Sequence, residues 1–178
     1  TEKLRSVDEN ERLEAAKSLA SSKDPKAIPP LLEALSDPDL RVKAKAIDAL
    51  GDLRAQDATP VLVQQLFLRE NDSGVKKRIL AALGKIGDPR AAGSILELLR
   101  RDLEPDMRGT ALFALGEIGS PDALPTLQAV SEGDPDLNMR RLAQQAIATV
   151  HHHQNVLATE AKEPQSTFLR SEKQPPTQ

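Results

Sequence analysis

Ala82-Leu83-Gly84 decides the fold of this chain, because close copies of it recur at a nearly constant spacing. Clear copies are Ala49-Leu50-Gly51 and Ala114-Leu115-Gly116, and weaker ones are Ser18-Leu19-Ala20 and Ala146-Ile147-Ala148. The central landmark residue falls at positions 19, 50, 83, 115 and 147, so that successive copies lie 31 to 33 residues apart. A fixed period of this length indicates a repeat array. Arrays of this kind usually act by offering surface, which makes binding the first function to consider.

The composition favours helices throughout. The 178 residues include no Trp, no Tyr and three Phe, so Ala and Leu must provide the core packing. Ala, Leu, Glu, Lys, Arg and Gln are strong helix formers, and runs of alternating Val, Ile and Thr are missing. The fold class predicted is therefore all-α. The absence of Cys excludes disulfides, thiolate chemistry and Cys-based zinc sites.

The charge balance argues against nucleic acid as a partner. There are 24 basic and 27 acidic residues, a formal net charge of −3, which gives no electrostatic reason to bind a polyanion. No apolar run approaches the roughly 20 residues that span a bilayer, so we expect no membrane insertion. The chain shows no secretory segment, and we expect a cytoplasmic location; a signal peptide removed before Thr1 stays an alternative.

Residues 37 to 68 serve as the type repeat. Asp37-Pro38-Asp39 is predicted to open the first helix, with Asp37 at the N-cap and Pro38 at the first helical position. Gly51, and likewise Gly84 and Gly116, is predicted to end the helix in a left-handed conformation. A short turn and a second helix follow, as in 27–35 and 91–99.

Each helical hairpin carries apolar residues on too many sides to be stable alone, so neighbouring hairpins must stack. We expect four full hairpins and a closing helix, about five units in all, within one cooperative domain over residues 1–153. Residues 154–178 are rich in Gln, Pro, Ser, Thr, Lys and Glu and are predicted to form a disordered C-terminal tail.

The string Ala82-Leu83-Gly84-Lys85-Ile86-Gly87-Asp88-Pro89-Arg90-Ala91 resembles HEAT repeats of the phycobilisome-lyase-like subclass. The fourth repeat is almost as similar, and the resemblance covers about residues 8 to 150. The second repeat departs by one extra residue in the turn, the first has Ala20 in place of Gly, and the fifth lacks the turn. The resemblance implies an α-solenoid of HEAT-like hairpins. It also implies a concave groove lined by the second helices, here called B helices.

A basic residue stands seven positions before every landmark, and this ladder is the most regular polar feature of the sequence. Its members are Arg12, Lys43, Lys76, Arg108 and Arg140. The family resemblance implies a structural role, in which each residue bridges to an acid of a neighbouring turn, such as Asp24 or Asp88. An anion-binding stripe is the alternative.

The candidate partner-binding residues lie at outward positions of the B helices. They are Lys26, Glu33, Gln64, Leu68, Arg90, Glu97 and Arg101. Glu33, Gln64 and Glu97 share one offset from their landmarks and would form a polar row. A simply solvated face is the alternative to a peptide-binding row. Phe67, which precedes Leu68, is either part of a small exposed anchor or packed into the next repeat.

Catalytic and metal chemistry find little support. The only histidines are His151, His152 and His153, and consecutive helical residues point about 100° apart, so they cannot close on one metal ion. No nucleophile with a histidine partner in the repeats can be named. We therefore predict no catalytic residue, no metal and no cofactor.

One apolar island interrupts the tail. Phe168 and Leu169 stand among polar residues, and such a pair in a disordered segment is often a short docking motif. The sequence leaves open whether the pair binds this chain or another protein.

The function predicted is that of a non-catalytic scaffold or adaptor, which binds a protein partner along the B-helix groove. The alternative implied by the resemblance is a subunit or relative of a bilin lyase, which would need a bilin cavity and commonly a second subunit. A third possibility is assembly, with end repeats stacking on another copy; the oligomeric state is open.

Overall fold

The structure is a computed structural model that describes residues 2–101 and 103–161. The first helices of the repeats are α1 (Glu9–Ser22), α3 (Leu40–Asp52), α5 (Ser73–Ile86), α7 (Pro105–Ile118) and α9 (Leu137–Glu160). The second, shorter helices are α2 (Ile28–Ala34), α4 (Thr59–Leu66), α6 (Ala92–Leu99) and α8 (Leu124–Gly133). Single 3-10 turns are η1 (Glu2–Arg5), η2 (Pro25–Ala27), η3 (Gln56–Ala58), η4 (Pro89–Ala91) and η5 (Pro121–Ala123).

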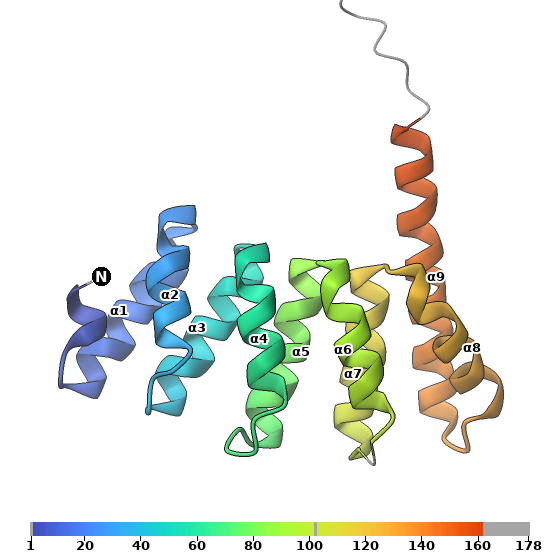
Figure 1. The fold of residues 1–178 in the computed structure, drawn as a ribbon, viewed down its shortest axis with the longest axis horizontal. Coiled ribbons are helices and arrows are strands. Elements are labelled where there is room, and N and C mark those ends of the chain that lie inside the picture. Colours follow the sequence, from blue (N-terminus) through green and yellow to red (C-terminus); the bar gives the residue numbers. More distant parts are fainter. Residues whose placement is uncertain (1, 102, 162–178) are drawn as a thin grey trace, which may run out of the picture.

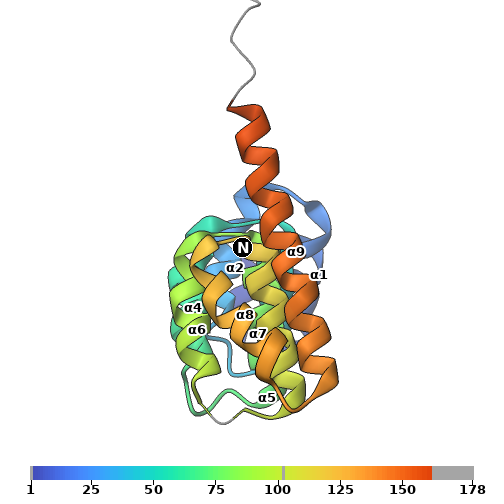
Figure 2. The ribbon, with the colours of Figure 1, turned by 90° about the vertical axis from the view of Figure 1, so that its right-hand side faces the viewer.

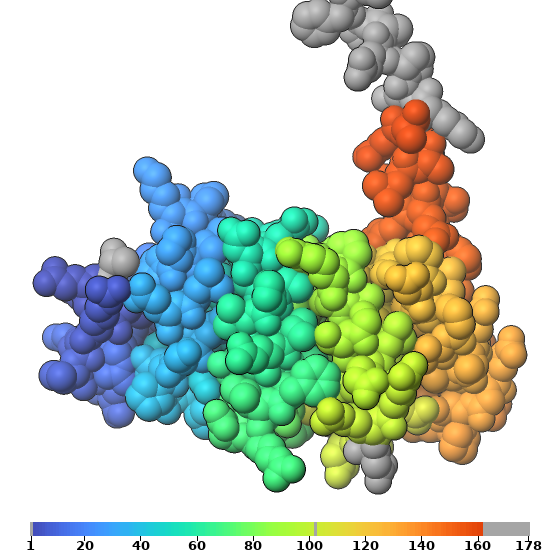
Figure 3. Space-filling model, viewed as in Figure 1, coloured from blue at the N-terminus to red at the C-terminus, as the bar shows by residue number. Residues whose placement is uncertain are grey.

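These helices form two layers that run the length of the molecule. The first helices stand side by side in one layer and the second helices in the other (Figure 1, Figure 2). Four hairpins, α1–α2 to α7–α8, are closed by α9 within the described residues. The prediction of an all-α solenoid of HEAT-like hairpins is therefore confirmed. The space-filling view shows the repeats as successive bands (Figure 3).

Aspartates begin most of the first helices. The side chains of Asp8, Asp39, Asp72 and Asp136 accept hydrogen bonds from backbone amides of the first turn. The prediction that Asp37 is the N-cap and Pro38 the first helical residue is wrong, because the helix begins at Leu40 and Asp39 is its cap. Asp37 instead accepts from the backbone amide of Asp39 at 2.8 Å, so it holds the turn that leads into the helix.

Gly51, Gly84 and Gly116 do not end their helices, and that prediction is wrong as well. Each lies inside the last turns of α3, α5 or α7. A Cβ atom at Gly116 would lie 2.8 Å from the Cα of Ala146, and one at Gly51 would lie 3.0 Å from the Cα of Ala82. These glycines are therefore needed for the close approach of neighbouring first helices.

The left-handed residue that follows the first helix lies four positions after the landmark. Gly87 and Gly119 occupy this position in the third and fourth repeats, with φ of 70° and 72°. Lys23 and Arg54 occupy it in the first and second, with φ of 51° and 50°. The equivalent residue of the last repeat is His151, which is helical.

Because no such turn forms at His151, α9 runs on to Glu160. Residues 154–160, which the sequence analysis assigned to a disordered tail, are helical and project beyond the body of the solenoid (Figure 3). The rest of the predicted tail, with Phe168 and Leu169, lies outside the described residues.

One continuous core runs through the stacked repeats. Its fully buried side chains are aliphatic and come from both layers. The landmarks Leu50, Leu83 and Leu115 lie in first helices, and Leu31, Leu62 and Ile95 lie in second helices. Small residues fill the contacts between first helices, with Ala46, Ala82, Ala114 and Ala146 all buried. Ala and Leu therefore supply the packing, and the repeats depend on one another for burial.

Candidate protein-binding surface

The basic ladder is a set of structural bridges wherever its contacts are described. Arg12 donates to Asp37 from Nε to Oδ2 at 2.8 Å and from Nη2 to Oδ1 at 3.1 Å. The two side chains are 13 % and 7 % exposed, and the hydrogen bond raises the pKa of the Arg12 guanidinium. Arg12 thus ties α1 to the turn that begins the next repeat.

The same device recurs farther along the chain. Lys43 donates from Nζ to Oδ1 of the buried Asn71 at 3.1 Å, and Arg108 forms an ion pair with the buried Asp134. Arg140 donates to the backbone carbonyl of Asp134. The position that corresponds to Asp37 for Lys76 is Asp102, which lies outside the described residues.

The acids proposed for these bridges were the wrong ones. Asp24 caps η2 through the backbone amide of Lys26 at 2.9 Å, and Asp88 pairs with Arg90 at 2.6 Å. The true acceptors lie one or two residues before the cap of the next first helix. Arg12, Lys43 and Arg108 therefore tie successive repeats together, whereas Lys76 lines a crevice together with Arg101 and Met107.

The predicted partner-binding residues gather on the layer of second helices, and we call this set the B-helix face. All are exposed except the half-buried Leu68. Lys26 lies in η2, Glu33 in α2, Gln64 in α4, Arg90 in η4 and Glu97 in α6, while Leu68 and Arg101 follow α4 and α6. Corresponding elements of successive repeats therefore present them.

Several charges of the B-helix face are already paired. Glu33 forms an ion pair with Arg5 of η1 at 3.0 Å, and Glu97 forms one with Arg100 at 3.3 Å. Arg90 pairs with Asp88 and also donates to the backbone carbonyl of Gln56 in the preceding repeat at 3.2 Å. Arg90 is thus partly a structural residue, whereas the exposed pair at Glu33 contributes only about 0–1 kcal/mol.

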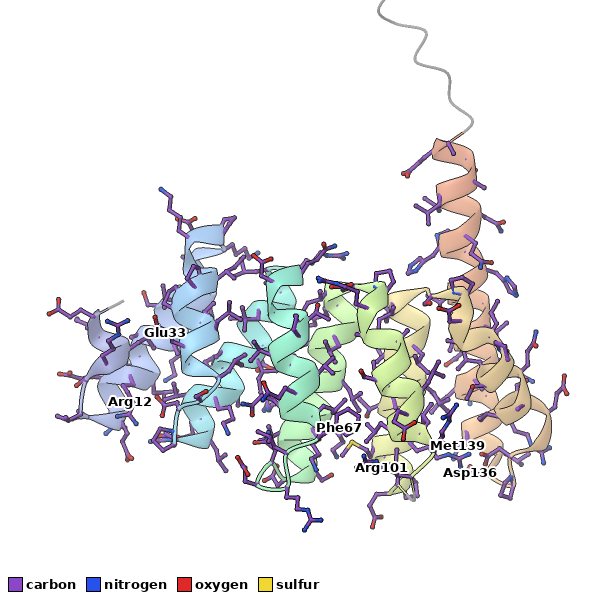
Figure 4. The ribbon with its side chains drawn as sticks, in the orientation of Figure 1. Arg12, Glu33, Phe67, Arg101, Asp136 and Met139 are labelled. Carbon is purple, nitrogen blue, oxygen red and sulfur yellow. The ribbon has the colours of Figure 1, made fainter. Side chains whose placement is uncertain are left out.

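An aromatic contact lies at the end of this face. The guanidinium of Arg101 lies 4.9 Å from the ring centroid of Phe67, and both are labelled where α4 and α6 end (Figure 4). Phe67 is half-buried against the core. This favours the interpretation that it packs into the protein, and not the alternative that it is an exposed anchor. A crevice of about 260 Å³ adjoins the contact, with Leu66, Leu98, Arg101 and Met107 in its lining. The guanidinium of Arg101 thus lies beside a crevice with apolar residues in its lining.

Two further crevices were not found from the sequence. One, of about 490 Å³, lies between α7 and α9 and is lined in part by Gly109, Phe113 and Leu142. Phe113 is 55 % exposed and stands where the other repeats carry Lys17, Asp48, Ala81 and Gln145. An aromatic residue at an otherwise polar or small position was the signal that could have found it.

The other crevice, of about 610 Å³, lies between the end of α9 and the turns that link first to second helices. Its walls include Pro89, Ile118, Pro121, Val156 and Leu157. The lack of glycine at position 151 does not predict that α9 continues far enough to form it, because Lys23 and Arg54 adopt the left-handed turn at the same position without glycine.

The shifted carboxylates belong to helix starts. Hydrogen bonds from Arg41 lower the pKa of Asp39 to about 2, and those from Arg90 lower the pKa of Asp88. Both aspartates also cap a helix or 3-10 turn. These shifts therefore have a structural explanation that needs no reaction chemistry.

Residues 2–101 and 103–161 were compared with the requirements of a metal site and of a membrane span. The structure groups no three His, Cys, Asp or Glu side chains where a metal ion would fit. His152 and His153 have ring centroids 6.3 Å apart. None of the helices there combines the length and the apolar character needed to cross a bilayer.

Comparison with known proteins identifies the repeats. The family model for HEAT repeats matches residues 1–79, 42–102 and 92–158. Among curated proteins, none matches this sequence. The complex of CpcE and CpcF of phycocyanin lyase from Nostoc sp. PCC7120 is similar in structure, with a TM-score of 0.69 and 24 % identity over 91 % of this chain and 69 % of that chain. An engineered protein is also similar, with a TM-score of 0.59 and 22 % identity over 85 % of this chain and 77 % of that chain.

Proposed function

Because the chain belongs to the HEAT-repeat family, we propose that it is a non-catalytic scaffold or adaptor that binds a protein partner along its B-helix face. The observation that carries the proposal is the row of exposed Glu33, Gln64 and Glu97, which stand at one register in three successive repeats. Repeat arrays present extended surfaces of this kind to other proteins.

The chemistry of the face suits a polar partner with an aliphatic or aromatic anchor. Acidic and basic groups alternate along it, from Lys26 and Glu33 to Glu97 and Arg101. The crevice beside Phe67 and Arg101 offers an apolar site for one anchoring side chain. A few buried anchors with a polar rim are the usual energetic pattern of protein interfaces.

Affinity capture with paired variants tests the proposal. In the B-face variant, Glu33→Lys, Gln64→Lys and Glu97→Lys are combined. The control combines Glu14→Lys, Asp106→Lys and Gln145→Lys on the first-helix layer. The control makes the same change in net charge, and each variant breaks two exposed ion pairs.

We expect one protein to be captured from an extract of the cells that make the chain, to stay with the control and to be lost with the B-face variant. Equal loss with both variants would point to general charge effects. Retention by the B-face variant would place binding elsewhere on the molecule.

A second candidate function is a role as a subunit or relative of a bilin lyase. The similarity to the CpcE and CpcF complex is the observation that favours it, and it also favours a protein partner. An absorbance titration with a free bilin, with and without a phycobiliprotein, separates the two roles. A spectral change on binding would support the lyase relation, and an unchanged spectrum in both arms would remove it.

A further inference from the structure

The end of α9 stands beside an apolar crevice that the B-helix face does not include. Val156 and Leu157 are 41 % and 66 % exposed on the part of α9 that projects from the solenoid. Opposite them lie Pro89, Ile118 and Pro121, at the turns of the third and fourth repeats. Pro89 and Pro121 are exposed on this wall, whereas Ile118 is buried at the end of α7. Exposed apolar groups on two facing walls indicate a site that another apolar group covers.

A contact below the crevice fixes its geometry. His153 lies against Gly119, where a Cβ atom would overlap the imidazole ring. Gly119 therefore lets α9 pass close to the turn, and the helix that carries Val156 and Leu157 is held at a defined distance from the opposite wall. The crevice is thus a feature of the packed solenoid.

The chain itself supplies a fitting group nearby. The described residues end at Ala161, one helical turn beyond Leu157, and Phe168 follows seven residues later. Seven extended residues span about 24 Å, whereas the last turns of α9 from Val156 to Ala161 rise only about 8 Å. The segment after Ala161 is therefore long enough to return to the crevice.

Phe168 and Leu169 are the only large apolar residues between 162 and 178. Arg170 follows them directly, and Glu160 is the one charged residue that lines the crevice. The crevice volume of about 610 Å³ lies within the range of about 300–1,000 Å³ that is typical of sites for small ligands. The apolar lining of the crevice therefore suits Phe168 and Leu169, and the charge of Glu160 is opposite to that of Arg170.

We propose that the crevice between α9 and the turns of the third and fourth repeats binds Phe168 and Leu169 of the same chain. Arg170 then lies near Glu160 at the rim. A short tether gives the pair an effective concentration of about millimolar, so a modest contact is enough to fill the site. This inference goes beyond the proposed partner binding and does not depend on it.

A spin label on the tail tests the proposal. The sequence contains no Cys, so Ser171→Cys gives a single site for a nitroxide. Paramagnetic broadening is measured at the amides of Gly87 and Gly119, on the crevice wall opposite α9. We expect both amides to be broadened at least twofold more than in the same chain with Phe168→Ala and Leu169→Ala. A control with Lys173→Ala and Gln174→Ala keeps the broadening.

A variant of the crevice provides an independent arm. Leu157→Glu changes an exposed residue and should abolish the extra broadening, whereas Ala158→Glu, at the exposed neighbouring position outside the crevice, should not. Equal broadening with and without Phe168 and Leu169 would overturn the proposal. A mixed sample gives the other contradicting result. In it, the ¹⁵N-labelled chain has no Cys, and a second chain without ¹⁵N carries the nitroxide. If the amides of the ¹⁵N-labelled chain were broadened in this sample, the occupant would be a second copy and the proposal would be overturned.

Discussion

At the residue scale, backbone conformation explains features that side-chain chemistry does not. Arg54 has a φ of 50° at the end of α3, and its neighbour Ala55 donates to the carbonyl of Leu50 at 3.1 Å, which is the hydrogen bond of a Schellman motif. Gly87 and Gly119 occupy the same position in later repeats. A left-handed conformation costs a side-chain-bearing residue about 1–2 kcal/mol, so the second repeat carries strain that the third and fourth avoid.

Arg54→Gly should therefore raise the free energy of unfolding by about 0.5–1 kcal/mol, since part of the relieved strain is offset by the greater freedom of Gly in the unfolded chain. Urea unfolding monitored by circular dichroism measures it. Arg54→Ala is the control, because it removes the same side chain and keeps the strain. Equal stabilisation by both variants would show that the guanidinium, and not the backbone, was unfavourable.

The charge of Asp39 should contribute stability that depends on pH. Hydrogen bonds from Arg41 lower the pKa of Asp39 to about 2, below the value of about 3.9 in an unfolded chain. The contribution is thus present above about pH 4 and is lost as the pH falls toward 2. Asp39→Asn keeps the helix cap but removes the charge, so the variant should be less stable at pH 7.

Comparison of the two chains by urea unfolding at several pH values tests this. The gap in unfolding free energy should narrow steadily below pH 4. A gap that stays constant from pH 7 to pH 2.5 would contradict the prediction, because the charge of Asp39 would then not be the source of the difference in stability.

At the element scale, the first helices approach one another through glycines inside them. The sequence predicted correctly that Gly51, Gly84 and Gly116 mark a recurring structural point, but it assigned them to helix ends. Glycine is common at both kinds of position, and only the neighbouring helix decides between them. The register of Gly116 against Ala146 is a property of two repeats together, which the local pattern does not contain.

Gly116→Ala should destabilise the chain by about 1–2 kcal/mol. The added Cβ atom would meet Cα of Ala146 at 2.8 Å, and overpacking of this kind outweighs the better helix propensity of Ala. Gly93→Ala in α6 is the matched control, because no heavy atom lies within 4 Å of its Cβ position. Thermal unfolding should show opposite signs for the two variants, and stabilisation by both would contradict the close approach.

The starts of the first helices also involve contacts that the local sequence does not show. Either aspartate of the motif Asp37-Pro38-Asp39 is a possible cap, and the preference of Pro for the first helical position favours Asp37. The structure uses Asp39, while Asp37 accepts hydrogen bonds from Arg12. Asp37 thus takes part in a bridge between residues 25 positions apart, which the local motif does not contain.

At the scale of the whole molecule, the period of the landmarks predicted a repeat array, and the family resemblance implied that the array is a solenoid of HEAT-like hairpins. Five copies at 31 to 33 residues predicted the number of repeats, and the composition predicted helices throughout. The separate layer of second helices was what the family resemblance implied. The row on the B-helix face could also be predicted from the sequence. Glu33, Gln64 and Glu97 have the same offset from their landmarks, so they take the same position on successive second helices. The crevice at Phe113 has a sequence signal in the aromatic residue itself, but its opposite wall, like the whole crevice at Leu157, depends on contacts between different repeats that the local pattern does not contain.

The stacked architecture predicts that the last helix is essential to the solenoid. α9 packs on both α7 and α8 and buries Met139, Ala143, Ala146 and Val150. A chain that ends at Gly133 should lose on the order of 5 kcal/mol of unfolding free energy, a large share of a typical total. A chain that ends at Ala161 is the control.

Urea unfolding of the two truncated chains and the intact chain checks this prediction. The chain ending at Ala161 should keep nearly all the stability of the intact chain. A cooperative transition for the chain ending at Gly133 at an unchanged urea midpoint would show that the repeats do not depend on α9.

The central claim, that the B-helix face binds the partner, is tested most directly by a dissociation constant. Titration calorimetry of the captured partner against the intact chain, the B-face variant and the first-helix control supplies it. We predict that the combined Glu33→Lys, Gln64→Lys and Glu97→Lys changes weaken binding at least tenfold, about 1.4 kcal/mol, while the control changes it less than about threefold. Equal affinities for the B-face variant and the intact chain would contradict the account.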